Sequence, residues 1–160
     1  MDSGGPYINA AFFCERVIEE RDGTLSAIRI VDRITNMAVG TGTPAAMPAM
    51  PVNLALLIAL KPGRALGRHD VQITAERPSG IRTDMASALS VNLEGGDRGA
   101  NLVMNLSLVV TEEGLYWFDV VVDETVLTRV PLRVLYQRQE AGPPPGESGS
   151  PGPSGNRPQL

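Results

Sequence analysis

The only histidine, His69, is followed directly by Asp70, and this pair is the one place where the sequence could orient an imidazole for acid–base chemistry. A carboxylate beside an imidazole supplies two parts of a catalytic triad, but the third part is a positioned nucleophile. The sequence has no GxSxG motif, which would place a serine on a sharp strand-to-helix turn. We therefore expect His69 to be an exposed histidine in a turn, and a hydrolase with a site near His69 is an alternative hypothesis.

Residues that could bind metals or cofactors are scarce. One histidine and one cysteine leave no ligand set for zinc, copper or haem. Carboxylates cluster at 19–22 and 112–113, but neither cluster has the DxDxDG spacing of a calcium loop. The glycine groups GTGTP and EGGDRG match no phosphate-binding motif. The sequence predicts no cofactor and no metal, and Cys14, among apolar neighbours, is expected to be a small buried hydrophobe.

Composition narrows the class of partner. The chain has 160 residues, 42% of them apolar, a net charge of −4 and an isoelectric point near 5.0, so it lacks the basic character of a nucleic-acid-binding domain. Thirteen arginines stand against a single lysine, Lys61. The N-terminus does not read as a signal peptide. The longest apolar run, 52–60, is about half the ~20 residues that a membrane-spanning helix needs. We expect a cytoplasmic protein with no nucleic-acid partner and no membrane span.

Outside the irregular segment 36–51, alternation of apolar and polar residues dominates the chain up to about residue 137. It is clearest in residues 24–35, 52–60, 69–77 and 101–110, with a weaker example at 86–93. Short strands separated by polar turns indicate an all-β fold, an antiparallel sandwich or barrel of seven or eight strands. The stretch 141–160 is rich in glycine and proline and almost free of bulky apolar residues. We predict one domain at 6–137 and a disordered tail at 138–160.

A first hairpin is predicted at the N-terminus, although the apolar residues between positions 10 and 17 also fit helical spacing. The Asp-Gly pair in the turn 21–23 would join a strand ending near residue 19 to the strand 24–35. This register places Phe12 and Cys14 on the face that carries the isoleucines of the second strand. It opposes Glu15 to Arg29 and Phe13 to Val31. We expect the isoleucine face to point inward. Asp32 falls on the same face, where an unpaired carboxylate would be costly, so we expect it at a strand end, paired with an arginine or capping a loop.

A second hairpin is predicted in GLYWFDVVVDETVLTRVPLRV, residues 114–134. A three-residue loop, Asp123–Thr125, opposes Asp119 to Arg129 and Trp117 to Pro131 and keeps the other face apolar. Asp119 is then a cross-strand charge partner rather than an acid catalyst. Proline removes a ladder donor, which predicts a sheet edge or a bulge at that position. Trp117 either covers its own sheet or anchors a partner.

Two further surfaces are candidates. The irregular segment 36–51 carries Met47 and Met50, which either form an adaptable contact surface or cap one end of the core. Four outward arginines would form a basic stripe if their strands shared one sheet face: Arg29, Arg33, Arg129 and Arg133.

The order NLVMNLSLVVTEEGLYWFDVVVD, residues 101–123, resembles the last strands of immunoglobulin-like sandwiches. Tyr116 stands where such folds have a tyrosine corner, in which the hydroxyl bonds to nearby backbone. The single cysteine excludes the antibody type. Together with FFCERV, DGTLSAIRIVDRIT and TRVPLRV, residues 6–137 resemble an uncharacterised bacterial family known only as a domain of unknown function. The resemblance implies an immunoglobulin-like antiparallel β-sandwich and a bacterial source, and it brings no catalytic motif.

We therefore expect a non-catalytic protein-binding or scaffold module, an accessory component of a bacterial multi-protein assembly. The candidate partner-binding residues are Trp117, Pro131, Arg129, Met47 and Met50. A small-ligand or carbohydrate-binding sandwich is an alternative, although only seven aromatic residues are available for stacking.

Overall fold

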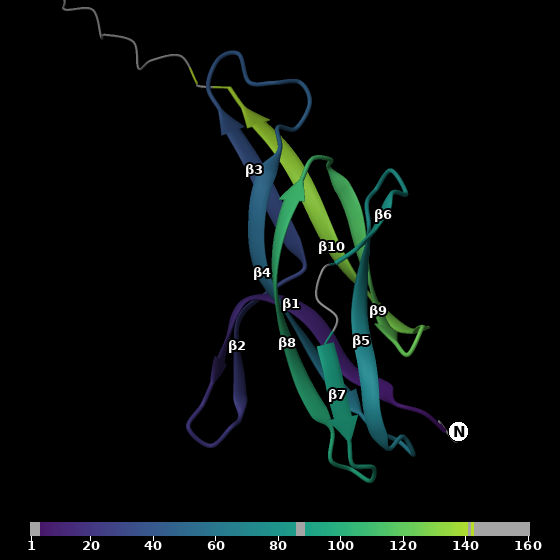
Figure 1. The fold of residues 1–160 in the computed structure, drawn as a ribbon. Coiled ribbons are helices and arrows are strands. Elements are labelled where there is room, and N and C mark those ends of the chain that lie inside the picture. Colours follow the sequence, from purple (N-terminus) through teal and green to yellow (C-terminus); the bar gives the residue numbers. More distant parts are fainter. Residues whose placement is uncertain (1–3, 86–88, 141, 143–160) are drawn as a thin grey trace, which may run out of the picture.

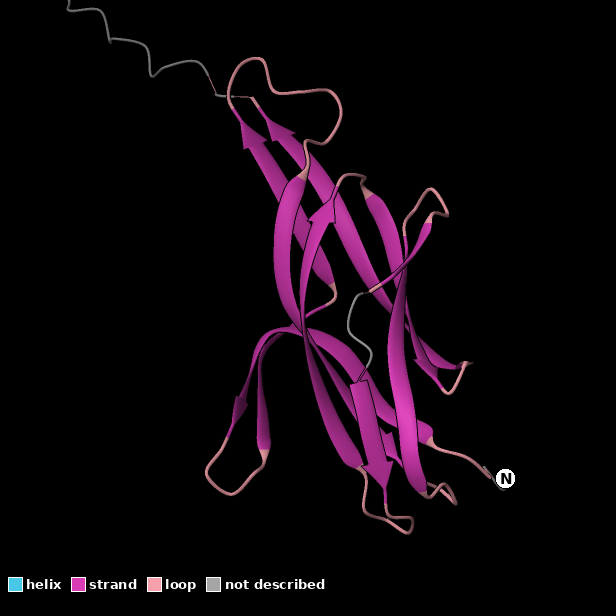
Figure 2. Cartoon of the chain, in the orientation of Figure 1, coloured by secondary structure: helices cyan, strands magenta, loops and turns pink. Residues whose placement is uncertain are grey.

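The fold is a sandwich of two β-sheets (Figures 1 and 2). A computed structural model describes residues 4–85, 89–140 and 142, and these residues contain strands and loops but no helix. The expected all-β sandwich is confirmed.

Each sheet combines strands from distant parts of the chain. The first sheet has the order β2-β1-β4-β8 and the second has the order β3-β10-β9-β5-β6, with β7 also paired to β5. The strands are β1 (Tyr7–Glu19), β2 (Leu25–Val31), β3 (Arg33–Val39), β4 (Met50–Lys61), β5 (Gly67–Glu76), β6 (Arg82–Asp84), β7 (Leu89–Leu93), β8 (Ala100–Val110), β9 (Gly114–Val122) and β10 (Thr125–Gln139).

The core lies between the sheets and follows from the alternation in the sequence. β4 contributes its even-numbered residues from Val52 to Leu60, and β9 and β10 contribute theirs from the other sheet. Phe13 of β1 meets Phe118 of β9 edge to face, with ring centroids 4.8 Å apart at 75°. Such aromatic pairs stabilise by about 0.5–1.5 kcal/mol beyond the area that they bury.

The N-terminal hairpin has the predicted register. Phe13 pairs with Val31, Arg29 forms an ion pair of 3.1 Å with Glu15, and backbone hydrogen bonds between residues 20 and 24 and from Gly23 to residue 20 close the turn. The prediction for the isoleucines needs correction for β2, because Ile30 is 66% exposed and Ile28 does not pack against the core, whereas Ile34, on the separate strand β3, does. The opposite face of this hairpin, which carries Phe13 and Val31, packs into the sandwich.

The predicted single strand 24–35 is two strands that belong to different sheets. The chain breaks at the exposed Asp32, and β3 then runs parallel to β10 while β2 stays with β1. Asp32 therefore lies at a strand end as expected, and its backbone carbonyl accepts a hydrogen bond from the Arg133 N–H at 2.9 Å. This split and the short β6 raise the number of strands in the described residues to ten, against the predicted seven or eight.

The β9–β10 hairpin reaches the predicted register by another route. The loop has two residues, Asp123 and Glu124, both with positive φ (46° and 67°), so the predicted three-residue loop is wrong. A two-residue loop alone would have shifted every pair by one residue. A bulge between Val126 and Thr128 inserts one extra residue and restores the pairing of Asp119 with Arg129 and of Trp117 with Pro131. Only the pairs nearest the turn differ from expectation.

The corner before β9 is fixed by Tyr116, as predicted. Its side chain is 5% exposed, its hydroxyl donates to the Glu112 carbonyl at 3.1 Å, and the Glu112 N–H donates to the hydroxyl at 3.3 Å. Both backbone groups of the corner residue are thereby satisfied within one turn.

β10 extends two residues past the predicted domain boundary, to Gln139. Most of the predicted tail, residues 141 and 143–160, lies outside the described residues. Within the part of the chain that the structure describes, no helix is long and apolar enough to cross a bilayer.

Candidate functional site

The candidate surface lies on the outer face of the second sheet and is centred on Trp117. Two rows of cross-strand neighbours run over β10, β9 and β5. One row is Pro131, Trp117 and Glu76, and the other is Arg129, Asp119 and Thr74. Because opposed residues of an antiparallel pair share a face, these six side chains form one patch.

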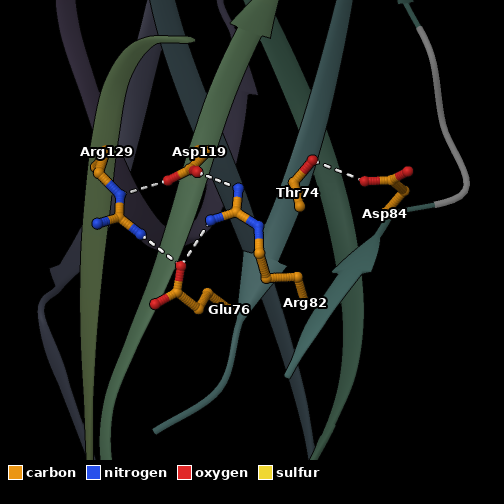
Figure 3. Close-up of polar contacts among 6 residues, drawn as sticks. All are labelled: Thr74, Glu76, Arg82, Asp84, Asp119 and Arg129. Atoms are coloured by element: carbon orange, nitrogen blue, oxygen red, sulfur yellow. Dashed lines mark hydrogen bonds and ion pairs between the residues drawn. The ribbon is translucent and has the colours of Figure 1, made fainter. Parts of the chain in front are cut away.

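Four charged side chains in and beside this patch form a closed cluster (Figure 3). Asp119 accepts from Arg129 Nε and from an Arg82 terminal nitrogen, both at 2.6 Å. A Glu76 oxygen accepts from Arg82 at 2.7 Å and from Arg129 at 2.8 Å. Each arginine thus bridges both carboxylates. Two cations and two anions leave the charged cluster formally neutral.

Asp119 is the buried centre of the charged cluster. It is 3% exposed, and within the described residues it is the one charged residue in the buried class. Burial by itself raises the pKa of the Asp119 carboxyl, but the hydrogen bonds and charges of Arg129 and Arg82 outweigh it and hold the pKa below its ordinary value. The bonds to Asp119 also raise the pKa of both guanidinium groups. Asp119 therefore stays ionised at neutral pH, consistent with its predicted role as the cross-strand charge partner of Arg129.

The tryptophan and the charged cluster are in direct contact. The Arg129 guanidinium carbon lies 5.1 Å from the centroid of the Trp117 ring, within cation–π range. The two carboxylates fix the position of that guanidinium, so the arginine over the tryptophan is held in one orientation while 42% of its side chain stays exposed. Trp117 itself is partly exposed.

Pro131 marks a local opening in the sheet. β10 is an interior strand, but its pairing with β3 begins only at Arg133. The Arg133 N–H donates to Asp32 at the start of β3. Alternate N–H groups of a strand point to the same side, so the nitrogen of Pro131 faces the space just before β3 begins. No ladder donor is needed there, which explains how a proline fits within an interior strand.

The methionines lie elsewhere. Met50 starts β4 in the first sheet, opposite Val110, and both Met47 and Met50 are partly buried against the core. Tyr136 donates to the Pro44 carbonyl at 2.8 Å and ties the 40–49 loop to β10. The structure therefore brings together Trp117, Arg129 and Pro131 but places the methionines as a cap on the core.

The predicted arginine stripe is divided between the sheets. Arg33 and Arg133 are direct partners in the parallel β3–β10 pair. Arg129 and Arg133 both lie on the outer face of β10, with Pro131 between them. Arg29 belongs to β2 in the other sheet and pairs with Glu15. Because carboxylates also neutralise Arg129, the predicted stripe reduces to the neighbouring pair Arg33 and Arg133.

His69 is not the exposed turn residue that the sequence predicted, because it lies within β5. Its side chain is 14% exposed, and its Nδ1 lies 2.5 Å from an Asp123 oxygen, while the other Asp123 oxygen accepts from the Asp70 N–H at 3.0 Å. These two bonds, the backbone one first, lower the pKa of the Asp123 carboxyl. The Asp70 carboxylate accepts from Ser90 at 2.6 Å instead of contacting the imidazole. His69 Nε2 is buried and has no hydrogen-bond partner among the described residues. The His69–Asp70 neighbour pair is therefore not a dyad.

Two members of the charged cluster could not be seen from the hairpin sequence alone. Arg82 lies 37 positions from Asp119 and Arg129 lies 53 positions from Glu76, and they meet only because β5 pairs with β9 while β6 folds back along β5. In the sequence, the charged residues among positions 76–84 were the one indication of these two partners. Within the described residues, no group of three or more histidine, cysteine or acidic side chains could hold a metal ion.

The fold and this surface define a β-sandwich domain with an arginine–tryptophan patch on one sheet. The chain belongs to a family of unknown function, DUF6941, whose family model matches residues 9–135. No curated protein matches the sequence significantly.

Two solved structures are distantly similar to the chain. One is a β-glucosidase from Listeria innocua in complex with glucose, with 10% identity, a TM-score of 0.45, and coverage of 78% of this chain and 16% of that protein. The other is the CARDB domain of the PF1109 protein from Pyrococcus furiosus in complex with di-metal ions, with 13% identity, a TM-score of 0.39, and coverage of 86% of this chain and all (100%) of that domain. The chain thus spans a small part of the glucosidase. At these TM-scores, neither likeness bears on function.

Proposed function

We propose that the protein is a non-catalytic protein-binding module, an accessory component of a bacterial multi-protein assembly, and that it binds its partner through Trp117, Arg129 and Pro131. The observation that carries the proposal is the contact of an exposed arginine, held in place by the carboxylates of Asp119 and Glu76, with a partly exposed tryptophan.

The residue types support binding to a protein. Tryptophan and arginine are the residues most enriched among those that dominate protein–protein binding energies. A side chain that is already fixed loses little conformational entropy when a partner arrives, a loss that otherwise costs about 0.5–1.5 kcal/mol for each ordered side chain. Here Arg129 is held by Asp119 and Glu76, so the patch is preorganised.

The charge balance supports the same role. Guanidinium groups that already pair with carboxylates keep those bonds when a partner covers them, so no unpaired charge is buried. Arg82 and Arg129 are 49% and 42% exposed, and their remaining N–H groups can donate to the carbonyl or carboxylate groups of a partner.

The test compares three forms of the full chain as bait in a lysate of the native organism. They are wild type, Trp117→Ala, and the control Leu66→Ala, which truncates a side chain that is 69% exposed in the turn between β4 and β5. A protein retained by wild type and by the control but lost by Trp117→Ala is then purified and titrated. We expect its dissociation constant to rise at least about tenfold for Trp117→Ala.

Circular dichroism and a denaturant titration establish that Trp117→Ala is folded before the binding comparison. Equal affinity of wild type and Trp117→Ala for every retained protein would overturn the proposal. Saturable quenching of Trp117 fluorescence by a glycan panel would instead favour the carbohydrate-binding alternative.

A further inference from the structure

The edge strand β8 is long and carries none of the features that usually protect a sheet edge. Among the described residues, its backbone pairs only with β4, so its other side is open along eleven residues. Its sequence, ANLVMNLSLVV, has no charged residue and no proline. Natural sheet edges are commonly blunted by charges, prolines, bulges or very short strands, because an unprotected edge pairs with other chains.

The other open edges of the sandwich differ from β8. β2 and β3 have seven residues each and contain Arg29 and Arg33, while β6 has three residues, two of them charged. β7 is uncharged but has only five residues. β8 is therefore the longest uncharged edge that the described residues offer.

β8 is complementary to itself when it is turned around. In an antiparallel pair of two copies with full overlap, the two-fold axis passes through the midpoint of β8, and Asn105 lies opposite Asn105 of the partner copy. Every other residue then opposes the residue that lies equally far on the other side of Asn105. On the side that faces the core, Leu102 then opposes Leu108 and Met104 opposes Leu106. On the outer side, Val103 opposes Ser107 and Asn101 opposes Val109.

This register satisfies both faces. The core-side residues of β8 are buried or partly buried and all apolar, so the core continues across the pair without a polar mismatch. The outer residues are uncharged, so no like charges meet at the two-fold axis. A pair of this length makes roughly ten backbone hydrogen bonds.

The inward side of β8 has room for a neighbour at its C-terminal end. A cavity of about 190 Å³ opens between the sheets, where Leu108 and Val110 of β8 face Tyr116 and Phe118 of β9. In the full-overlap register, the partner copy places its own Leu102 beside Leu108 at the mouth of this cavity. Arg77 and Thr83 also line this cavity, and an apolar side chain at its mouth would shield the apolar part of the lining from water.

We propose that β8 is the interface of a homodimer, in which two copies join their first sheets edge to edge into one continuous eight-stranded sheet. The occupant of the edge is a second copy of this chain, since the strand supplies its own complement on both faces. This surface lies on the sheet opposite the Trp117 patch and does not depend on the protein-binding role proposed for that patch.

The first test measures the molecular mass by sedimentation at protein concentrations of about 1 to 100 µM, the range in which weak homodimers dissociate. Wild type is expected to shift from monomer to dimer, and Asn105→Lys to raise the dissociation constant at least about tenfold, because two lysines face each other at the axis. The matched control, Thr35→Lys, places the same residue on the exposed face of the other sheet's edge strand β3 and should leave the dimer unchanged.

The second test does not rely on loss of binding. Directly opposed residues of an antiparallel pair have Cα atoms about 4.5–5.5 Å apart, within the range that a disulfide spans. Asn105→Cys should therefore form a disulfide-linked dimer under mild oxidation, while Thr35→Cys should not. The native Cys14 does not interfere, because it is fully buried.

Three results would each overturn the dimer: a wild-type chain that stays monomeric throughout this range, a dimer that Asn105→Lys leaves intact, or Asn105→Cys that links no faster than Thr35→Cys. Trp117→Ala should retain wild-type dimerisation. Failure of partner binding and failure of the dimer are thus separate outcomes.

Discussion

Replacing Asp119 by asparagine tests whether the charged cluster holds the second sheet together. The asparagine has nearly the same shape but no charge, and its amide nitrogen cannot accept from a guanidinium. Asp119 is 3% exposed and accepts two hydrogen bonds of 2.6 Å from arginines. A hydrogen bond to a charged group contributes about 1.5–3 kcal/mol.

The expected loss is smaller than the sum of two such bonds. Arg82 and Arg129 are nearly half exposed, so each regains water when the carboxylate is removed, and Glu76 still pairs with both. We expect Asp119→Asn to lower the free energy of unfolding by about 2 kcal/mol at neutral pH. Unfolding in guanidinium chloride is followed by the fluorescence of Trp117, which lies beside the charged cluster, and independently by circular dichroism.

The control is Glu94→Gln, which makes the same carboxylate-to-amide change at an exposed pair. Glu94 is 58% exposed, and among the described residues it pairs with Arg98, at 3.0 Å. Exposed ion pairs contribute about 0–1 kcal/mol, so this variant should stay within about 0.5 kcal/mol of wild type. A loss below about 0.5 kcal/mol for Asp119→Asn as well would refute a stabilising role for the charged cluster.

The pH dependence provides a second check on the same variant. The arginines lower the pKa of Asp119 in the folded state, whereas an unfolded aspartate titrates near about 3.9. A lowered folded pKa means that the contribution is present in full above the unfolded value and is lost as pH falls through the folded value. The gap between wild type and Asp119→Asn should therefore persist at pH ~6 and shrink below pH ~4. A gap that is independent of pH would contradict this reasoning.

Two further substitutions and one labelling experiment test other features of the structure. Tyr116→Phe removes both hydrogen bonds to the Glu112 backbone and should cost about 1 kcal/mol in a urea titration; an unchanged midpoint would contradict the role of the corner. Glu124→Gly should stabilise by about 0.5–1 kcal/mol, measured as a higher melting temperature, because glycine adopts the positive φ of 67° without strain; a lower melting temperature would argue against the two-residue loop. Cys14 is fully buried and burial raises the pKa of its thiol, so alkylation should be slow in the native protein and fast in denaturant; equal rates would show that the site opens.

Local pairing was predictable from the sequence because charge and hydrophobicity specified the same registers. The pairs Glu15–Arg29 and Asp119–Arg129 are both present, and the hydroxyl of Tyr116 bonds where the corner requires it. The β9–β10 register was correct although the loop length was not. The side-chain pattern of the strands decides the register, and a bulge at Leu127 absorbs the difference.

Features that depend on sheet membership were not predictable. Alternation shows that a strand has two faces but not which sheet it joins, so the run 24–35 gave no sign that it changes sheets at Asp32. The orientation of Ile30 was misjudged for the same reason, because two apolar faces compete and Phe13 takes the core side. His69 was expected in solvent because a turn precedes it, but the strand that begins there places the imidazole inward against Asp123.

The parallel pairing of β3 with β10 has a consequence for how the chain folds. Its partners are about a hundred residues apart, as in Arg33 and Arg133, so closing the second sheet requires nearly the whole domain to be synthesised. Until β10 has been synthesised, β9 leaves an edge of the second sheet unpaired, and β3, which among the described residues pairs only with β10, has no sheet to join. Long-range pairing of this kind folds in milliseconds to seconds. A chain that stops before residue 125 therefore has no closed second sheet, and the final strand decides whether the molecule is a folded domain or an aggregation-prone intermediate.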